Sequence, residues 1–140
     1  MNTSLYRAAS EISLFCRLNL KQKIEIPIRH SELGVLLFLY GAKEDVTPMA
    51  VSDFMGISRP CATVMLKRLE NDGYIFRQPS QHDKRSCNLL LTDKGCQIIS
   101  VAHQEYCKTM QLLESGLGTE SFEHFLELIE KSNQILRQKS

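Results

Sequence analysis

The sequence lacks the features that mark membrane-spanning and secreted proteins. No apolar run comes near the roughly 18 residues that a membrane-spanning helix requires. The first residues, MNTSLYRAASEIS, contain no basic segment followed by an apolar one, which is the pattern of a secretory signal. We therefore expect a cytoplasmic protein.

Cysteine is present, but its arrangement excludes two common frameworks. The five cysteines are odd in number and form no CxxC pair, so neither a disulfide framework nor a zinc ribbon is expected. Internal repeats and low-complexity linkers are also missing. The 140 residues, 43% of them hydrophobic, are enough for one core, and we predict a single domain over residues 1–140.

A large net charge is lacking as well, because the formal charge of the chain is only +1. The charges are nevertheless unevenly distributed. Residues 58–95 carry seven basic and four acidic side chains, whereas residues 1–57 are neutral and residues 96–140 are net acidic. This pattern favours contact between a polyanion and the middle of the chain, with an ordinary solvated surface as the alternative.

Hydrophobic periodicity predicts helices over most of the chain. The predicted helices cover residues 4–20, 31–41, 47–56, 58–71, 92–115 and 119–136. Hydroxyl side chains suited to N-capping precede four of them: Ser31, Thr47, Ser58 and Thr92. Residues 74–79 and 86–92 have the composition of strands and are separated by turn residues, which predicts a hairpin.

Residues 47–71 are typical of a helix-turn-helix, because two short helices are joined by a tight turn at Gly56. One side of the second helix is apolar: Ala62, Met65, Leu66 and Leu69. The other side is polar and available to a partner: Arg59, Thr63 and Lys67. With the hairpin that follows, the predicted fold is mainly α with a small β-hairpin wing, a winged helix-turn-helix.

Two motifs in this part of the chain point to a family. Asp83-x-Arg85, followed by Leu91-Thr92-x-x-Gly95, has the pattern D-x-R-x(5)-L-T-x-x-G, and SRPCATVMLKRLENDGYIFR precedes it. The first matches the wing signature, and the second resembles the recognition helix and following strand, of the MarR family of bacterial winged-helix transcriptional regulators. The resemblance covers essentially the full length. It implies a DNA-binding lobe at about 31–95 and dimerisation helices at about 1–25 and 96–140.

The exposed N-terminal half of the recognition helix is predicted to enter the major groove of double-stranded DNA. Its candidate DNA-binding residues are Ser58, Arg59, Pro60, Thr63 and Lys67. Arg59 suits a guanine edge or a phosphate, Thr63 a thymine methyl group or a phosphate, and Ser58 a phosphate. The sequence leaves these roles open.

The hairpin tip is predicted to enter the minor groove, where Lys84 and Arg85 would meet a concentrated negative potential. Asp83 repels DNA, so we expect it to orient the Arg85 guanidinium or to cap the turn. The alternative is an exposed ion pair between Asp83 and Arg85 with little energetic weight. His82 is interpreted as a solvated turn residue.

The three long helices outside the winged-helix lobe carry more apolar surface than that lobe can cover. The resemblance implies that they form a homodimer, whose two recognition helices would read half-sites about 10 bp apart in a palindromic operator. It also implies repression, released by a small-molecule or redox signal. No cofactor is expected.

Three kinds of trigger site have candidates in the sequence. An effector cleft between the dimerisation helices and the DNA-binding lobe would use Phe15, Arg17, His30, Phe38 and Tyr40. A redox sensor would use Cys16 in the first helix, for which a plain packing role is the alternative. A metal site would draw on Cys96, His103 and Cys107, although no metal is expected.

An enzyme is not expected, because the sequence offers no nucleophile with a base and no paired carboxylates in a predicted pocket. Cys87 and His82 are close in sequence, but both belong to the predicted exposed wing. The alternative to a DNA-binding regulator is a dimerisation or protein-docking module without sequence-specific DNA binding.

Overall fold

The structure is a computed structural model that describes residues 2–20, 25–81 and 85–138. Most of the described chain is helical, and one antiparallel hairpin supplies the strands. The helices are α1 (Thr3–Leu20), α2 (His30–Gly41), α3 (Pro48–Met55), α4 (Arg59–Asn71), α5 (Asp93–Leu117) and α6 (Thr119–Gln138). The strands are β1 (Ile75–Pro79) and β2 (Cys87–Leu91). The predicted fold class, a winged helix-turn-helix with long terminal helices, is confirmed.

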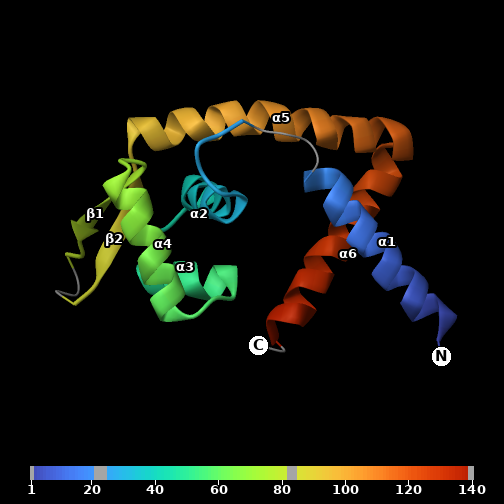
Figure 1. The fold of residues 1–140 in the computed structure, drawn as a ribbon, viewed down its shortest axis with the longest axis horizontal. Helices are drawn as coiled ribbons and strands as arrows, with labels where there is room; N and C mark the ends of the chain where they lie inside the picture. The colour runs from blue at the N-terminus through green and yellow to red at the C-terminus, as the bar shows by residue number, and fades with distance from the viewer. Residues whose placement is uncertain (1, 21–24, 82–84, 139–140) are drawn as a thin grey trace.

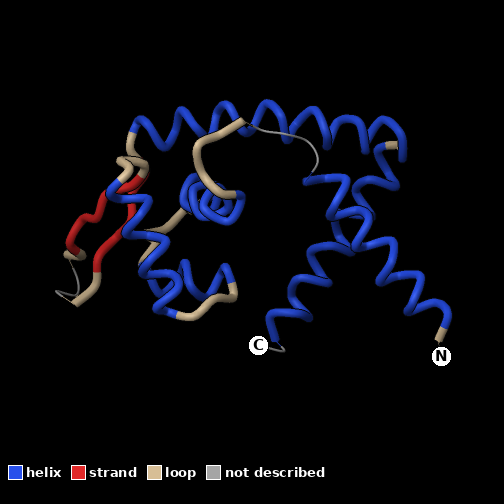
Figure 2. The backbone as a smooth tube through the Cα atoms, in the orientation of Figure 1, coloured by secondary structure: helices blue, strands red, loops and turns tan. Residues whose placement is uncertain are grey.

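Helix α5 joins two lobes (Figure 1). The winged-helix lobe, which contains α2, α3, α4 and the hairpin, lies beside the N-terminal half of α5. Helices α1 and α6 lie at its other end, and the tube in Figure 2 shows α6 running back toward the winged-helix lobe. Among the described residues, no helix has both the length and the apolar content to cross a membrane.

Three of the predicted N-caps form as expected. The hydroxyl oxygens of Thr47, Ser58 and Thr92 accept hydrogen bonds from the backbone N–H groups three residues later, at 3.1 to 3.2 Å. Helix α3 ends at Gly56, whose φ of 64° is the left-handed conformation that a glycine C-cap adopts readily. The helix-turn-helix therefore begins and turns where its sequence predicts.

The N-cap predicted at Ser31 is wrong. Helix α2 begins at His30, and Arg29 occupies the N-cap position with an extended backbone. The Glu32 carboxylate, three residues after Arg29, accepts a hydrogen bond from the Arg29 N–H group at 3.4 Å. Because Glu32 satisfies the helix end from within the first turn, the hydroxyl of Ser31 is not needed there.

The wing is a paired hairpin that is anchored to the rest of its lobe through β2. The register pairs Ile75 with Leu91 at the base of the hairpin and Pro79 with Cys87 farther out. The N–H group of Leu89 also donates to the carbonyl oxygen of Val46 at 2.8 Å, so the segment before α3 borders β2. This bond fixes the wing beside the start of the helix-turn-helix.

The core of the winged-helix lobe draws side chains from every element of the lobe and from α5. Its buried residues are Val35, Leu36, Leu39, Val46, Val51, Leu66, Leu69, Tyr74, Ile75, Leu89 and Ile99. Ile99 lies in the second turn of α5, so the start of that helix belongs to the lobe it supports. The recognition helix is held against this core and not by the wing alone.

The other lobe is thinly packed within a single chain. Phe122 of α6 is buried, and the rings of Phe15 and Phe125 meet edge to face with centroids 5.8 Å apart. Large apolar side chains on α1, the C-terminal half of α5 and α6 stay exposed: Leu5, Tyr6, Ile12, Leu14, Leu18, Leu112, Leu117, Leu128, Ile129, Ile135 and Leu136. A lobe with this much apolar surface in water is expected to bury it against another protein surface.

Candidate nucleic-acid interface

Helix α4 presents two chemically different sides, as the sequence predicts. Its packing side is formed by Ala62, Leu66 and Leu69, which are buried, and by Met65, which is half-buried. Its outward side is exposed: Arg59, Pro60, Thr63, Val64 and Lys67, with the cap residue Ser58. Because the packing side of α4 is buried in the lobe, the outward side is available for contact with a partner along the helix.

Hydrogen bonds within the protein already use part of the outward side. The Ser58 hydroxyl caps α4 by accepting the N–H of Cys61 at 3.2 Å, and the Thr63 hydroxyl donates to the carbonyl oxygen of Arg59 at 2.9 Å. The guanidinium of Arg59 lies 3.8 Å from the sulfur of Met49 on α3. Arg59 is thereby directed across the helix-turn-helix toward the start of α3.

A cleft of about 530 Å³ separates the start of α3 from the wing. It is lined by Thr47, Pro48, Met49, Arg77, Arg85, Ser86 and Cys87. Arg85 is exposed at the described end of the hairpin, so one of the two predicted cations of the wing tip lies beside the helix-turn-helix. Lys84, Asp83 and His82 lie outside the described residues.

The second half of the wing signature is a structural junction. Thr92 accepts the N–H of Gly95 and donates to the carbonyl oxygen of Gly73, in the turn after α4. A Cβ atom on Gly95 would overlap the backbone carbonyl of Tyr74, so only glycine fits there. These contacts fix the end of the recognition helix relative to α5.

An ion pair strengthens the same end of α4. The Arg77 side chain on β1 donates to the Glu70 carboxylate at 2.9 Å, with both groups about one third exposed. Its Nη1 also lies 3.7 Å from the Cys87 sulfur on β2. Arg77 therefore connects both strands of the wing to the recognition helix.

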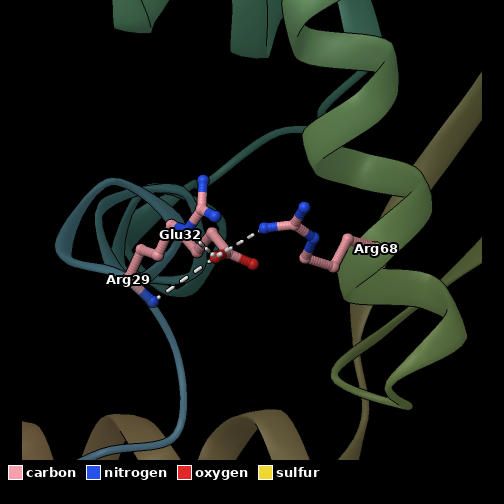
Figure 3. A network of polar contacts seen from close by, with 3 residues as sticks. All are labelled: Arg29, Glu32 and Arg68. Atoms are coloured by element: carbon pink, nitrogen blue, oxygen red, sulfur yellow. Dashed lines mark hydrogen bonds and ion pairs between the residues drawn. The ribbon is translucent and has the colours of Figure 1, made fainter.

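Sequence reasoning missed a second polar link, between α2 and α4 (Figure 3). The Glu32 side chain is buried, and its carboxylate lies 4.0 Å from the Arg29 guanidinium and 3.9 Å from that of Arg68. The position of Glu32, three residues after the N-cap Arg29, was the available signal for the first contact. Nothing in the sequence pairs Glu32 with Arg68 on another helix.

A cavity of about 390 Å³ lies on this flank of α4. It is lined by Arg29, Ser31, Glu32, Pro60, Cys61, Val64, Met65 and Arg68. None of these residues was among the effector candidates. The recognition helix thus has an apolar hollow on one flank, whereas the wing cleft is lined by the start of α3 and the hairpin.

The five effector candidates lie in different surroundings. Phe15 packs on Phe125 of α6, whereas Phe38 stacks on Phe54 of α3 with ring centroids 4.1 Å apart. The His30 Nδ1 lies 3.3 Å from the Tyr106 hydroxyl, and burial raises the pKa of Tyr106, which therefore stays neutral. Arg17 and Tyr40 are exposed. A common effector cleft for these five residues stays a prediction.

The candidate residues for a redox or metal site also lie apart from one another. Cys16 is exposed on α1, and the Cys107 sulfur lies 3.3 Å from the His103 Nε2 on α5. Cys96 precedes His103 by seven residues, about 10 Å along the helix axis, which is too far for all three to hold one ion. In the part of the chain that the structure describes, no group of three or more histidine, cysteine or acidic side chains could hold a metal ion.

A helix-turn-helix with an exposed second helix, followed by a hairpin beside it, defines the winged helix-turn-helix class. Among solved structures, MepR of S. aureus in a DNA-binding conformation has this fold, with a TM-score of 0.77, 23% identity, and coverage of 97% of this chain and 98% of MepR. FabT of Streptococcus pneumoniae in complex with DNA has a TM-score of 0.71 and 24% identity, covering 99% of this chain and 96% of FabT.

Sequence comparison agrees with the fold. The family model described as MarR family matches residues 27–86, which contain the helix-turn-helix and the first strand. The HTH-type transcriptional regulator PecS of Dickeya dadantii (strain 3937) is 27% identical over 107 residues, 76% of this chain. That match spans 64% of the length of PecS. Residues 27–86 are thus similar to the MarR family, as the recognition-helix motif predicts, and PecS extends the similarity to 107 residues.

Proposed function

We propose that this protein is a sequence-specific DNA-binding transcriptional regulator. The observation that carries the proposal is the outward side of α4, which is exposed over its full length and has the wing residue Arg85 on a neighbouring cleft. A helix held in this way fits the major groove, and an adjacent hairpin reaches the flanking groove. MepR in its DNA-binding conformation and FabT in complex with DNA share the fold that positions these elements.

We further propose that two copies act together as a homodimer on a palindromic operator. The exposed apolar side chains of α1, α5 and α6 support this, because a second copy presents the same surface and would cover it. Two recognition helices related by a twofold axis would contact half-sites about one helical turn apart. Repression, released by a small molecule or by oxidation, is the mode that the family resemblance implies.

Selection from a random duplex pool tests DNA recognition. The full chain is expected to enrich one palindromic sequence. Its affinity for that sequence should fall steeply as the salt concentration rises, because lysine and arginine side chains that bind phosphates displace counterions from the DNA. Enrichment of no sequence, with weak and salt-independent retention on DNA, would instead favour a docking module.

Sedimentation at micromolar concentration tests the assembly. The dimer is expected to sediment at about twice the 16.0 kDa of one chain. Replacing Ile12, which is 62% exposed on α1, by glutamate should shift the protein toward monomer, because the carboxylate would be buried in the interface. A wild-type monomer at this concentration would overturn the homodimer.

A further inference from the structure

The outward side of the recognition helix carries an exposed valine that the function described so far does not use. Val64 is 63% exposed and lies opposite the buried side chains of α4. Pro60 lies four residues before it and Lys67 three residues after it, so these three share one side of the helix. Val64 is therefore in the middle of the surface proposed to face DNA.

The atoms around Val64 have little hydrogen-bonding capacity left for base edges. Pro60 has no N–H group, and the hydroxyl proton of Thr63 is donated to the carbonyl oxygen of Arg59 at 2.9 Å. The guanidinium of Arg59 is directed toward the Met49 sulfur on α3. The side of α4 that Pro60 and Val64 share therefore presents mainly methyl and methylene groups to a partner.

The major groove contains one apolar group that such a surface can distinguish, the C5-methyl group of thymine. We propose that Val64 is a specificity-determining residue that contacts a thymine methyl group in each half-site. Lys67, on the same side of the helix, supplies the positive charge that holds this surface against the DNA backbone. The inference rests on the proposed function and adds the kind of base contact by which the operator is read.

Replacing thymine by uracil removes only the methyl group, which makes the inference directly testable. The operator selected by the wild-type chain is synthesised with uracil in place of each symmetric pair of thymines in turn. At one pair, the wild type is expected to lose about fourfold in affinity for each methyl group removed, the factor expected for one buried methyl-sized group. Fluorescence anisotropy at constant salt measures these affinities.

The Val64→Ala variant identifies the side chain responsible. It should bind the thymine operator about as weakly as the wild type binds the uracil operator, and uracil at that pair should cost it nothing further. Its fold is expected to persist, because the position is exposed and alanine is a better helix former than valine. Val101→Ala, at a valine that is 53% exposed on α5, is the matched control and should keep the wild-type response to uracil.

Two results would overturn the inference while leaving the proposed function intact. Either every uracil duplex binds the wild type as tightly as the thymine operator, or Val64→Ala keeps the wild-type sensitivity at every pair. In either case Val64 serves only as a wall of the cavity that it shares with Met65 and Arg68. Failure of the wild-type chain to select any duplex would refute the proposed function itself, and the inference with it.

Discussion

The hydroxyl of Thr92 donates a hydrogen bond to the backbone carbonyl of Gly73 and also accepts one from the N–H of Gly95. One side chain thus caps α5 and binds the turn that follows the recognition helix. The Lys94 ammonium completes the junction, because it donates to the carbonyl oxygen of Asp72 at 2.6 Å. Thr92, Lys94 and Gly95, in and beside the second half of the wing signature, therefore set the position of the recognition helix from the base of the hairpin.

Thr92→Val should lower the free energy of unfolding by about 1 to 2 kcal/mol, because it removes both hydrogen bonds while keeping the side-chain shape. Thr92→Ser keeps the hydroxyl group and should retain most of the stability. Urea unfolding followed by circular dichroism measures both variants. Equal stability of the valine variant and the wild type would show that the junction depends on packing alone.

Gly95→Ala should destabilise the protein by about 1 to 3 kcal/mol, because the added Cβ must displace the backbone at Tyr74. Gly116→Ala is the matched control on the same helix, where a Cβ meets nothing within 4 Å. This control should raise stability by up to about 1 kcal/mol through helix propensity. Thermal unfolding of the two variants gives the comparison, and a fully stable Gly95→Ala protein would contradict the close approach of α5 to the backbone of Tyr74, just before β1.

Glu32→Ala should cost about 1 to 3 kcal/mol of stability, because it removes the cap of α2 and leaves Arg29 and Arg68 without their shared carboxylate. Glu105→Ala breaks an exposed pair with Lys108 on α5 and should cost only about 0 to 1 kcal/mol. Chemical denaturation distinguishes them. Similar small losses at both positions would show that the buried pair adds no more than a surface pair.

Arg85→Ala should weaken operator binding by about 1 to 3 kcal/mol and reduce the preference for A·T-rich flanks. The melting temperature should stay close to that of the wild type, because Arg85 is exposed. Anisotropy titrations with operator and scrambled duplexes measure the effect, and Lys108→Ala serves as a control at an exposed cation of α5. Unchanged binding to both duplexes would mean that the wing has only a structural role.

Lys67→Ala should weaken binding to operator and scrambled duplexes nearly equally if Lys67 contacts a phosphate. The slope of log affinity against log salt should then fall by about one unit for each lysine removed from the DNA contact. A salt series with both duplexes provides this slope. Loss of preference at a single base position, with the slope unchanged, would instead identify Lys67 as a base-reading residue.

Local signals predicted most of the fold. Hydroxyl caps, a proline in the first turn of α3 and the glycine at its end fixed the helix-turn-helix, because each acts on backbone groups a few residues away. The predicted start of α2 was wrong because two local capping signals compete there. Glu32 caps the helix in place of Ser31, and hydrophobic periodicity does not distinguish these two possibilities.

Contacts between distant segments could not be predicted in this way. The pairing of Glu32 with Arg68 and the approach of Arg137 on α6 to the Phe54 ring depend on how whole helices pack. The outward side of α4 was identified because its helical period separates buried from exposed positions, yet Val64 was passed over. The predicted DNA-binding residues were chosen mainly for charge and hydrogen bonding. An apolar side chain such as Val64 can instead contact the methyl group of thymine.

Helix α5 contains 25 residues without interruption, which makes it about 37 Å long. One end is fixed to the recognition helix through Thr92 and Gly95, and the other leads directly into α6. A stiff rod of this length magnifies a rotation made at one end: a tilt of about 5° at the α6 end moves the end at Thr92 by about 3 Å, close to the rise of about 3.4 Å from one base pair to the next. A rearrangement of α1 and α6 too small to unfold either helix would therefore shift the DNA-reading surface out of step with its half-site.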